Sequence, residues 1–185
     1  MRLQRRRHCQ VELEPPVSQQ ELETFLGRPI RPLRGLLDPS RLQQCGPDLF
    51  DYVSKPYGVA GLTLQPRTRL RACWDGAELL IQQVASRVEG LGEWQNHLSF
   101  GLEASLAPAL QSGSAVLVAE AMVWADLPAA ALVASPALHL GLDQLLDRLE
   151  GRCQKGLRRR AEGWLRRHRE RSLASAPQGS AGPVG

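Results

Sequence analysis

The side chains most able to act as nucleophiles or metal ligands are four cysteines and four histidines. The cysteines lie at least 28 residues apart, none belongs to a C-x-x-C pair, and no closely spaced pair of histidines accompanies them. Because zinc sites usually draw on closely spaced thiolates or imidazoles, this spacing does not predict a metal site. We instead expect reduced, small hydrophobic side chains at Cys9, Cys45, Cys73 and Cys153.

Familiar catalytic patterns are missing from the sequence. It contains no G-x-S-x-G, no G-x-x-x-x-G-K-[ST], no G-x-G-x-x-G and no H-E-x-x-H motif. His97 lies in the polar run Gln95–Ser99, which could line a cleft, but the alternation around it is more typical of a histidine on the solvent face of a strand. The carboxylates are scattered along the chain, so the residues alone predict no catalytic group and no cofactor.

Charge is unevenly distributed along the 185 residues, although the formal net charge is only +4. Residues 1–8 carry four arginines and no acid, residues 9–147 sum to −7, and residues 148–171 sum to +7. An acidic body with basic ends argues against a uniformly basic nucleic-acid binder. We expect a basic arm at 1–8, one folded domain at 9–168 and a low-complexity, disordered tail at 169–185. No apolar h-region follows the first arginines, and the uncharged stretch 127–142 is short and broken by prolines, so we expect a cytoplasmic protein.

The hydrophobic pattern predicts the elements that would position any site. Residues 8–14 alternate like a strand, and Ser18 with Glu21 forms a capping box for a helix that ends at Gly27. Short helical pieces are expected at 32–37 and 40–45. From Leu49 to Trp124 the period is two, and it predicts about six antiparallel strands with a tight hairpin at Asp75-Gly76. Residues 115–125 are apolar on both faces apart from one glutamate, which is typical of a strand covered on both sides.

A long helix should follow the strands. Apolar residues recur at steps of three and four for seven turns, at Leu138, Leu142, Leu145, Leu149, Cys153, Leu157, Ala161 and Trp164. The opposite face is basic, and its candidate surface residues are Arg158, Arg159, Arg160, Arg166 and Arg167. A strand-rich body followed by such a helix favours an α+β helix-grip fold, in which a curved antiparallel sheet of about seven strands wraps on the C-terminal helix.

The sequence also resembles an uncharacterised cyanobacterial and plastid family with START-like, polyketide-cyclase-like architecture. The resemblance covers about residues 9–168 and rests on short motifs in order, although Arg160-Ala-Glu-Gly-Trp164 departs from the aspartate-aromatic pair usual before the final tryptophan. It implies the helix-grip fold and a protein of an oxygenic phototroph, and it implies no catalytic residues. The motifs are Phe25-Leu-Gly-Arg-Pro29, Leu37-Asp-Pro-Ser-Arg41, Leu64-Gln-Pro66, Val88-Glu-Gly-Leu91, Asp126-Leu-Pro128 and Gly141-Leu-Asp-Gln-Leu-Leu146.

Three functions are compatible with these patterns. The first is binding of a hydrophobic small molecule, such as a lipid, pigment or isoprenoid, in a cavity between sheet and helix lined by Phe100, Trp124 and Leu145. The same three residues could instead fill a solid core. The second is an interaction module whose basic ends dock on an anionic membrane surface, on a protein or on RNA, with nucleic acid the less favoured partner. The same basic residues could equally form a helix face that is exposed to solvent and binds no partner. The third is a cyclase or hydrolase. The sequence predicts no oligomeric state.

Overall fold

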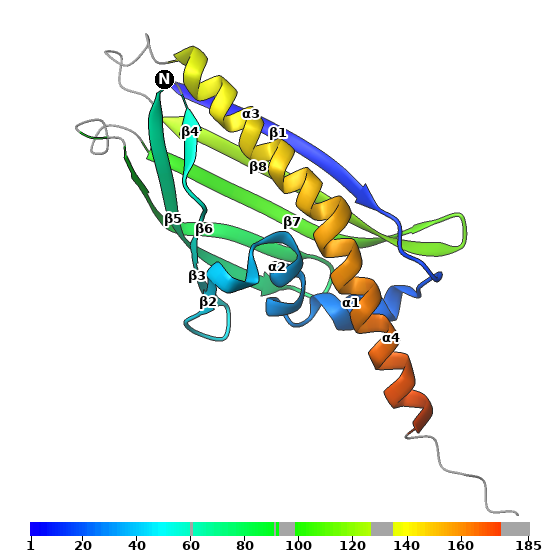
Figure 1. The fold of residues 1–185 in the computed structure, drawn as a ribbon. Helices are drawn as coiled ribbons and strands as arrows, with labels where there is room; N and C mark the ends of the chain where they lie inside the picture. The colour runs from blue at the N-terminus through cyan, green and yellow to red at the C-terminus, as the bar shows by residue number, and fades with distance from the viewer. Residues whose placement is uncertain (60, 91, 93–98, 127–134, 175–185) are drawn as a thin grey trace, which may run out of the picture.

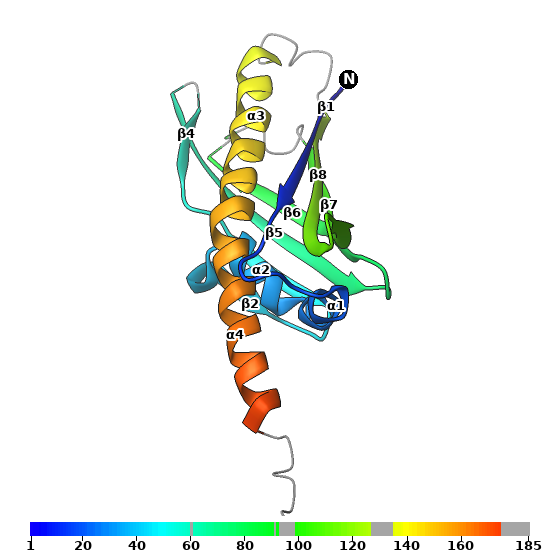
Figure 2. The same cartoon turned by 90° about the vertical axis from the view of Figure 1, so that its right-hand side faces the viewer.

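The computed structural model describes residues 1–59, 61–90, 92, 99–126 and 135–174. A twisted sheet curves around one long C-terminal helix, and two short helices close one end of the concave face (Figures 1 and 2). The strands are β1 (Arg2–Val11), β2 (Leu42–Gln44), β3 (Leu49–Val53), β4 (Tyr57–Val59), β5 (Leu62–Trp74), β6 (Leu79–Glu89), β7 (Ser99–Gln111) and β8 (Ser114–Asp126). The helical segments are α1 (Gln19–Leu26), α2 (Ile30–Leu36), η1 (Pro39–Arg41), α3 (Ser135–Arg152), η4 (Cys153–Leu157) and α4 (Arg158–Ala174).

The sheet is antiparallel throughout, with strand order β1-β8-β7-β6-β5-β3-β2 and β4 paired with β5. Alternation on β5 agrees with the sequence, because Leu70 and Ala72 are buried while Arg67, Arg69 and Arg71 are exposed. The predicted helix-grip architecture is therefore confirmed, with eight strands in the described residues where about seven were expected. His97, expected on a strand, lies outside the described residues.

The first strand begins earlier than the sequence suggested. It starts at Arg2 rather than at residue 8 and pairs with β8 along its whole length, so the four arginines expected in a basic arm lie within the sheet. Arg5 and Arg7 share the concave face with the buried side chains of Leu3 and Cys9. They face carboxylates of α3, at 3.1 Å from Arg5 Nε to Asp143 Oδ1 and 2.6 Å from Arg7 Nη2 to Asp147 Oδ1.

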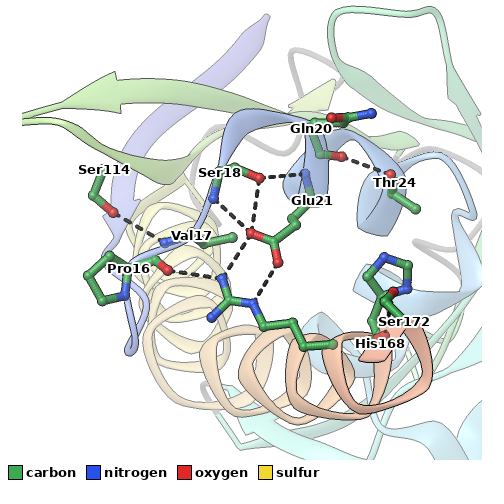
Figure 3. A network of polar contacts seen from close by, with 10 residues as sticks. Pro16, Val17, Ser18, Gln20, Glu21, Thr24, Ser114, His168 and Ser172 are labelled. Atoms are coloured by element: carbon green, nitrogen blue, oxygen red, sulfur yellow. Dashed lines mark hydrogen bonds and ion pairs between the residues drawn. The ribbon is translucent and has the colours of Figure 1, made fainter. Parts of the chain in front are cut away.

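The short helices after β1 are held by local capping and by the long helix. Ser18 and Glu21 form the predicted capping box at the start of α1. Residues 40–45 do not form the expected helical turns, because only Pro39–Arg41 is helical and Leu42–Gln44 adds a strand beside β3. Figure 3 shows the polar network at the start of α1, in which Glu21 accepts hydrogen bonds from Ser18 and also from Arg169 of α4.

The long helix packs across the concave face as three consecutive segments (Figure 2). Its middle segment, η4, has π-helical hydrogen bonding, and α2 crosses the long helix there at very short range. A Cβ added to Gly35 would lie 2.7 Å from the Leu157 Cα, and one added to Gly156 would lie 2.2 Å from the Gly35 carbonyl oxygen. Only glycine at these two positions allows the two backbones to approach this closely.

The core lies between the concave face and these helices. Its largest fully buried side chains include Phe25 of α1, Phe50 of β3 and Leu33 of α2, which meet Leu157 and Leu165 of the long helix. Among the described residues no polar or charged residue is fully buried, so burial of apolar surface dominates the packing of sheet against helices.

Candidate functional site

A cavity of about 70 Å³ lies between the concave face of the sheet and the helices. Its sheet side includes Ala104 of β7 with Ala119 and Ala121 of β8. Its helix side includes leucines of α2 and α3 and the start of η4. Alanines opposite the helix leave the space open, because a larger side chain at any of these positions would extend into it. The cavity wall is therefore apolar over most of its area.

The polar end of the cavity is formed by Arg7 and Glu150. Arg7 Nε lies 3.4 Å from Glu150 Oε2, while Arg7 Nη2 donates to Asp147 at 2.6 Å. The Nε atom is screened from solvent and makes no hydrogen bond to any described residue. An unsatisfied buried donor carries a cost of about 1–3 kcal/mol, so an acceptor placed beside it would be favoured.

Two cysteines line the same cavity. Cys9 of β1 and Cys153 of η4 are both buried, and Gln154 Nε2 lies 3.2 Å from the Cys9 Sγ. Burial strongly raises the pKa of the Cys153 thiol, and the neighbouring Cys9 raises it further. Cys153 therefore stays a neutral thiol at physiological pH, which contributes apolar surface rather than a nucleophile.

The three residues predicted to line a cavity lie elsewhere. Phe100 is on the concave face but packs toward α3 and β4, with the clusters around Leu142 and Leu64. Trp124 is on the opposite face, where its indole covers Gly101 and the Arg2 guanidinium carbon lies 5.5 Å from its ring centroid. Leu145 is 37% exposed on α3. The described residues that line the cavity include none of these three, and the helix contributes Leu146 and Leu149 instead.

The convex position of Trp124 also corrects the expectation that both faces of β8 are covered. Leu117, Val123 and Ala125 on the concave face are buried, whereas Glu120 on the other face is exposed. Apolar residues on the convex face, such as Trp124 and Met122, are only partly buried. The strand is central in the sheet because it pairs with β1 and β7, and its convex face is covered only in part, since Val116 is buried while Met122 and Trp124 are half-buried.

The five predicted basic residues of the long helix do not all have the same surroundings. Arg158 is ion-paired, at 3.0 Å to Glu162 and 3.3 Å to Glu14. Arg159, Arg166 and Arg167 are exposed, and Arg160 is half-buried. Four of these guanidinium groups therefore form no ion pair with a described residue, whereas Arg158 connects the helix to the segment after β1 through Glu14.

Sequence reasoning missed the basic residues that approach α4 from elsewhere. Arg28, Arg31 and Arg34 lie in or just before α2, which packs beside α4; Arg34 is close to Arg160, and Arg31 lies over Trp164 of α4. The pKa values of Arg31 and Arg160 are lowered, first by desolvation and then by neighbouring guanidinium groups. The spacing of three residues between Arg28, Arg31 and Arg34 was the available signal, because it places them along one side of a helix.

Within the described residues, no cluster of three or more side chains could hold a metal ion. None of the helices in that part of the chain combines the length and apolar character required to cross a bilayer. The carboxylates on the cavity wall, Glu120 and Glu150, are both solvent-accessible. What the described wall offers chemically is an apolar surface with the Arg7–Glu150 ion pair at one end.

No protein-family model matches the chain, and no curated protein matches it. Among solved structures, it is similar to a conserved protein from Geobacillus kaustophilus, with 10% identity, a TM-score of 0.52 and coverage of 89% of this chain and 96% of that one. It is also similar to a norcoclaurine synthase point mutant from Thalictrum flavum, with 10% identity, a TM-score of 0.51 and coverage of 91% and 98%. These similarities show a helix-grip fold and support that part of the START-like resemblance. They do not connect the chain with a phototroph.

Proposed function

We propose that this protein binds a small hydrophobic molecule, such as a lipid, pigment or isoprenoid, between the sheet and the long helix. The observation that carries the proposal is the apolar cavity beneath α2, α3 and η4, with the unsatisfied Arg7 Nε at its edge. A ligand with an apolar body and one carbonyl, hydroxyl or carboxylate oxygen matches both features. The synthase with the same fold was solved with a transition-state analogue, which is in keeping with a small-molecule site.

The size of the cavity decides how such a ligand must enter. Sites for drug-sized ligands measure about 300–1,000 Å³, whereas this cavity measures about 70 Å³. Binding therefore requires one wall to move. The α3 wall is fastened to β1 by Arg5–Asp143 and Arg7–Asp147 ion pairs whose side chains are substantially exposed. Exposed pairs contribute only about 0–1 kcal/mol each, so we assign the movement to α3 rather than to α2 with its close glycine contact.

The proposal is tested by filling the cavity. Ala121→Leu places a larger side chain in the cavity, while Ala85→Leu makes the same change at an exposed position of β6. We expect dodecanoic acid and farnesol to raise the melting temperature of the natural protein and of Ala85→Leu. Ala121→Leu should lose at least tenfold in affinity for both probes while keeping its circular dichroism spectrum.

Native mass spectrometry of the protein purified from its own host supplies a second readout. A bound mass that disappears in Ala121→Leu supports the site. Equal binding of both probes by the natural protein and Ala121→Leu places binding elsewhere, and a protein that binds neither probe and carries no ligand contradicts the proposal. Activity as a cyclase or hydrolase finds no specific support in the described cavity residues.

A further inference from the structure

A group of arginines from two separate parts of the chain meets where α2 packs beside α4. We call Arg28, Arg31, Arg34, Arg160 and Arg167 the α2–α4 arginine cluster. Arg28, Arg34 and Arg167 are exposed, and Arg31 and Arg160 are half-buried. Within the described part of the chain, none of the five guanidinium groups lies within 4.0 Å of a carboxylate.

Two of the neighbouring acids form ion pairs with arginines outside the cluster. Glu21 binds Arg169, and Glu162 binds Arg158, so neither neutralises the cluster. Glu23 of α1 accepts a hydrogen bond from Gln19. Glu170 is exposed on α4 and forms no ion pair with a described arginine of the cluster. Desolvation is the main reason that the pKa values of Arg31 and Arg160 are lowered, and repulsion between like charges adds to it. The neighbouring guanidinium groups are those of Arg28 and Arg171 for Arg31, and those of Arg34 and Arg167 for Arg160.

The cluster is held in place by packing rather than by counter-charges. Arg31 donates to the Thr24 carbonyl at 2.6 Å, and its guanidinium carbon lies 4.8 Å from the centroid of the Trp164 ring. His168 stacks on Trp164 at 4.6 Å between ring centroids. The cation–π contact with Trp164 favours this arrangement and fixes the position of the Arg31 guanidinium group. Its positive charge is balanced by solvent or by a binding partner.

We propose that the α2–α4 arginine cluster docks this protein on an anionic lipid surface. Repulsion among uncompensated arginines is relieved when lipid phosphates approach, and each basic residue near such a surface contributes favourably to binding. Single-stranded RNA fits the surface less well, because Trp164 is buried and is covered by Arg31 and His168, so it offers no free face for base stacking.

The test compares two triple variants in vesicle flotation. Arg28→Gln/Arg34→Gln/Arg167→Gln removes the three exposed charges of the cluster. Arg6→Gln/Arg87→Gln/Arg152→Gln makes the same change in net charge at exposed arginines outside it. At about fivefold per arginine, we expect the cluster variant to bind vesicles of phosphatidylcholine and phosphatidylglycerol on the order of a hundredfold more weakly at low salt. The control variant should bind nearly as the natural protein does.

Several outcomes would overturn the lipid proposal. They are equal losses in the two variants, no flotation of the natural protein, or equal flotation with vesicles of phosphatidylcholine alone. Cluster-dependent retention of a single-stranded RNA without vesicle binding would assign the surface to nucleic acid instead. The Ala121→Leu variant should float like the natural protein, because docking uses the outer surface of α2 and α4; the result is therefore independent of whether the cavity binds a ligand. Circular dichroism of each variant confirms that the fold is retained.

Discussion

The contact between Glu21 and Arg169 fastens α1 to the far part of the long helix, and replacing Glu21 by glutamine should destabilise the fold at neutral pH. The Glu21 carboxylate accepts from Arg169 Nε at 2.6 Å and from Nη2 at 2.9 Å. It also accepts from the Ser18 backbone N–H at 2.9 Å, which completes the capping box. A glutamine keeps one acceptor oxygen and loses the charge and the two-oxygen contact with the guanidinium group.

The magnitude follows from the pKa of Glu21. Hydrogen bonding to Arg169 is the main reason that this pKa falls from 4.5 to about 2. At about 1.4 kcal/mol per pH unit, the upper limit is about 3.4 kcal/mol of folding free energy. The Arg169 side chain is 36% exposed, so solvent screens the pair. We therefore expect Glu21→Gln to lower the free energy of unfolding by about 1–2 kcal/mol at pH 7.

The pH dependence gives the sharper result. Because the folded-state pKa lies below the unfolded value, the stabilisation is present in full above pH 4.5 and is lost as the pH falls toward 2. Urea unfolding, followed by circular dichroism at several pH values, should show the difference between the natural protein and Glu21→Gln shrinking over that interval. Glu23→Gln, which changes a carboxylate on the same helix without breaking an ion pair to a described residue, should differ little at any pH. A difference that is independent of pH, or equal in both variants, would refute the reasoning.

Two further predictions concern packing and thiol access. Gly35→Ala should destabilise the protein by about 1–3 kcal/mol in urea unfolding, because the added methyl group would lie 2.7 Å from the Leu157 Cα. Gly151→Ala, whose added methyl group would have nothing within 4 Å, should be neutral or slightly stabilising. Equal effects of the two substitutions would contradict the close crossing of α2 and η4. Ellman's reagent should modify the exposed thiol of Cys45 first, although the hydrogen bond to Asp51 raises the pKa of that thiol. Cys9 and Cys153 are buried in the cavity wall, and rapid labelling of these two thiols in the native protein would show that the wall opens freely.

Hydrophobic periodicity predicted where helices and strands occur better than it predicted which of their residues point toward the core. From Leu142 to Leu149, a stripe can pass through Leu145 by steps of three and four or through Leu146 by steps of four and three. Both satisfy helical spacing, and both residues are leucine, so the sequence could not choose between them. The structure buries Leu146 and leaves Leu145 exposed. The register of the helix against the sheet makes that choice, and it depends on long-range packing.

Trp124 illustrates the same difficulty on a strand. Apolar residues occupy nearly every position of β8, so alternation does not reveal which face is concave. The available clue was Gly101, which pairs with Trp124 across β7 and β8 and leaves room for the indole on the convex face. The cavity, for its part, depends on small residues at Ala104, Ala119 and Ala121, whereas the prediction looked for large ones. A cavity forms where side chains are too short to meet, so the search for aromatic linings led away from it.

The arginines of β1 have a structural role that their charge concealed in the sequence. Arg5 and Arg7 occupy inward positions at which alternation would call for apolar residues, and their acidic partners Asp143 and Asp147 lie more than 130 residues away. Once these pairs form, α3 neutralises Arg5 and Arg7, and Asp126 of β8 neutralises Arg2. Outer sheet arginines are compensated in the same way, as in Arg69 with Asp51 at 2.7 Å. Part of the positive charge that remains lies in the α2–α4 arginine cluster. That cluster draws on both an acidic and a basic segment of the sequence, which explains why net charge by segment did not reveal it.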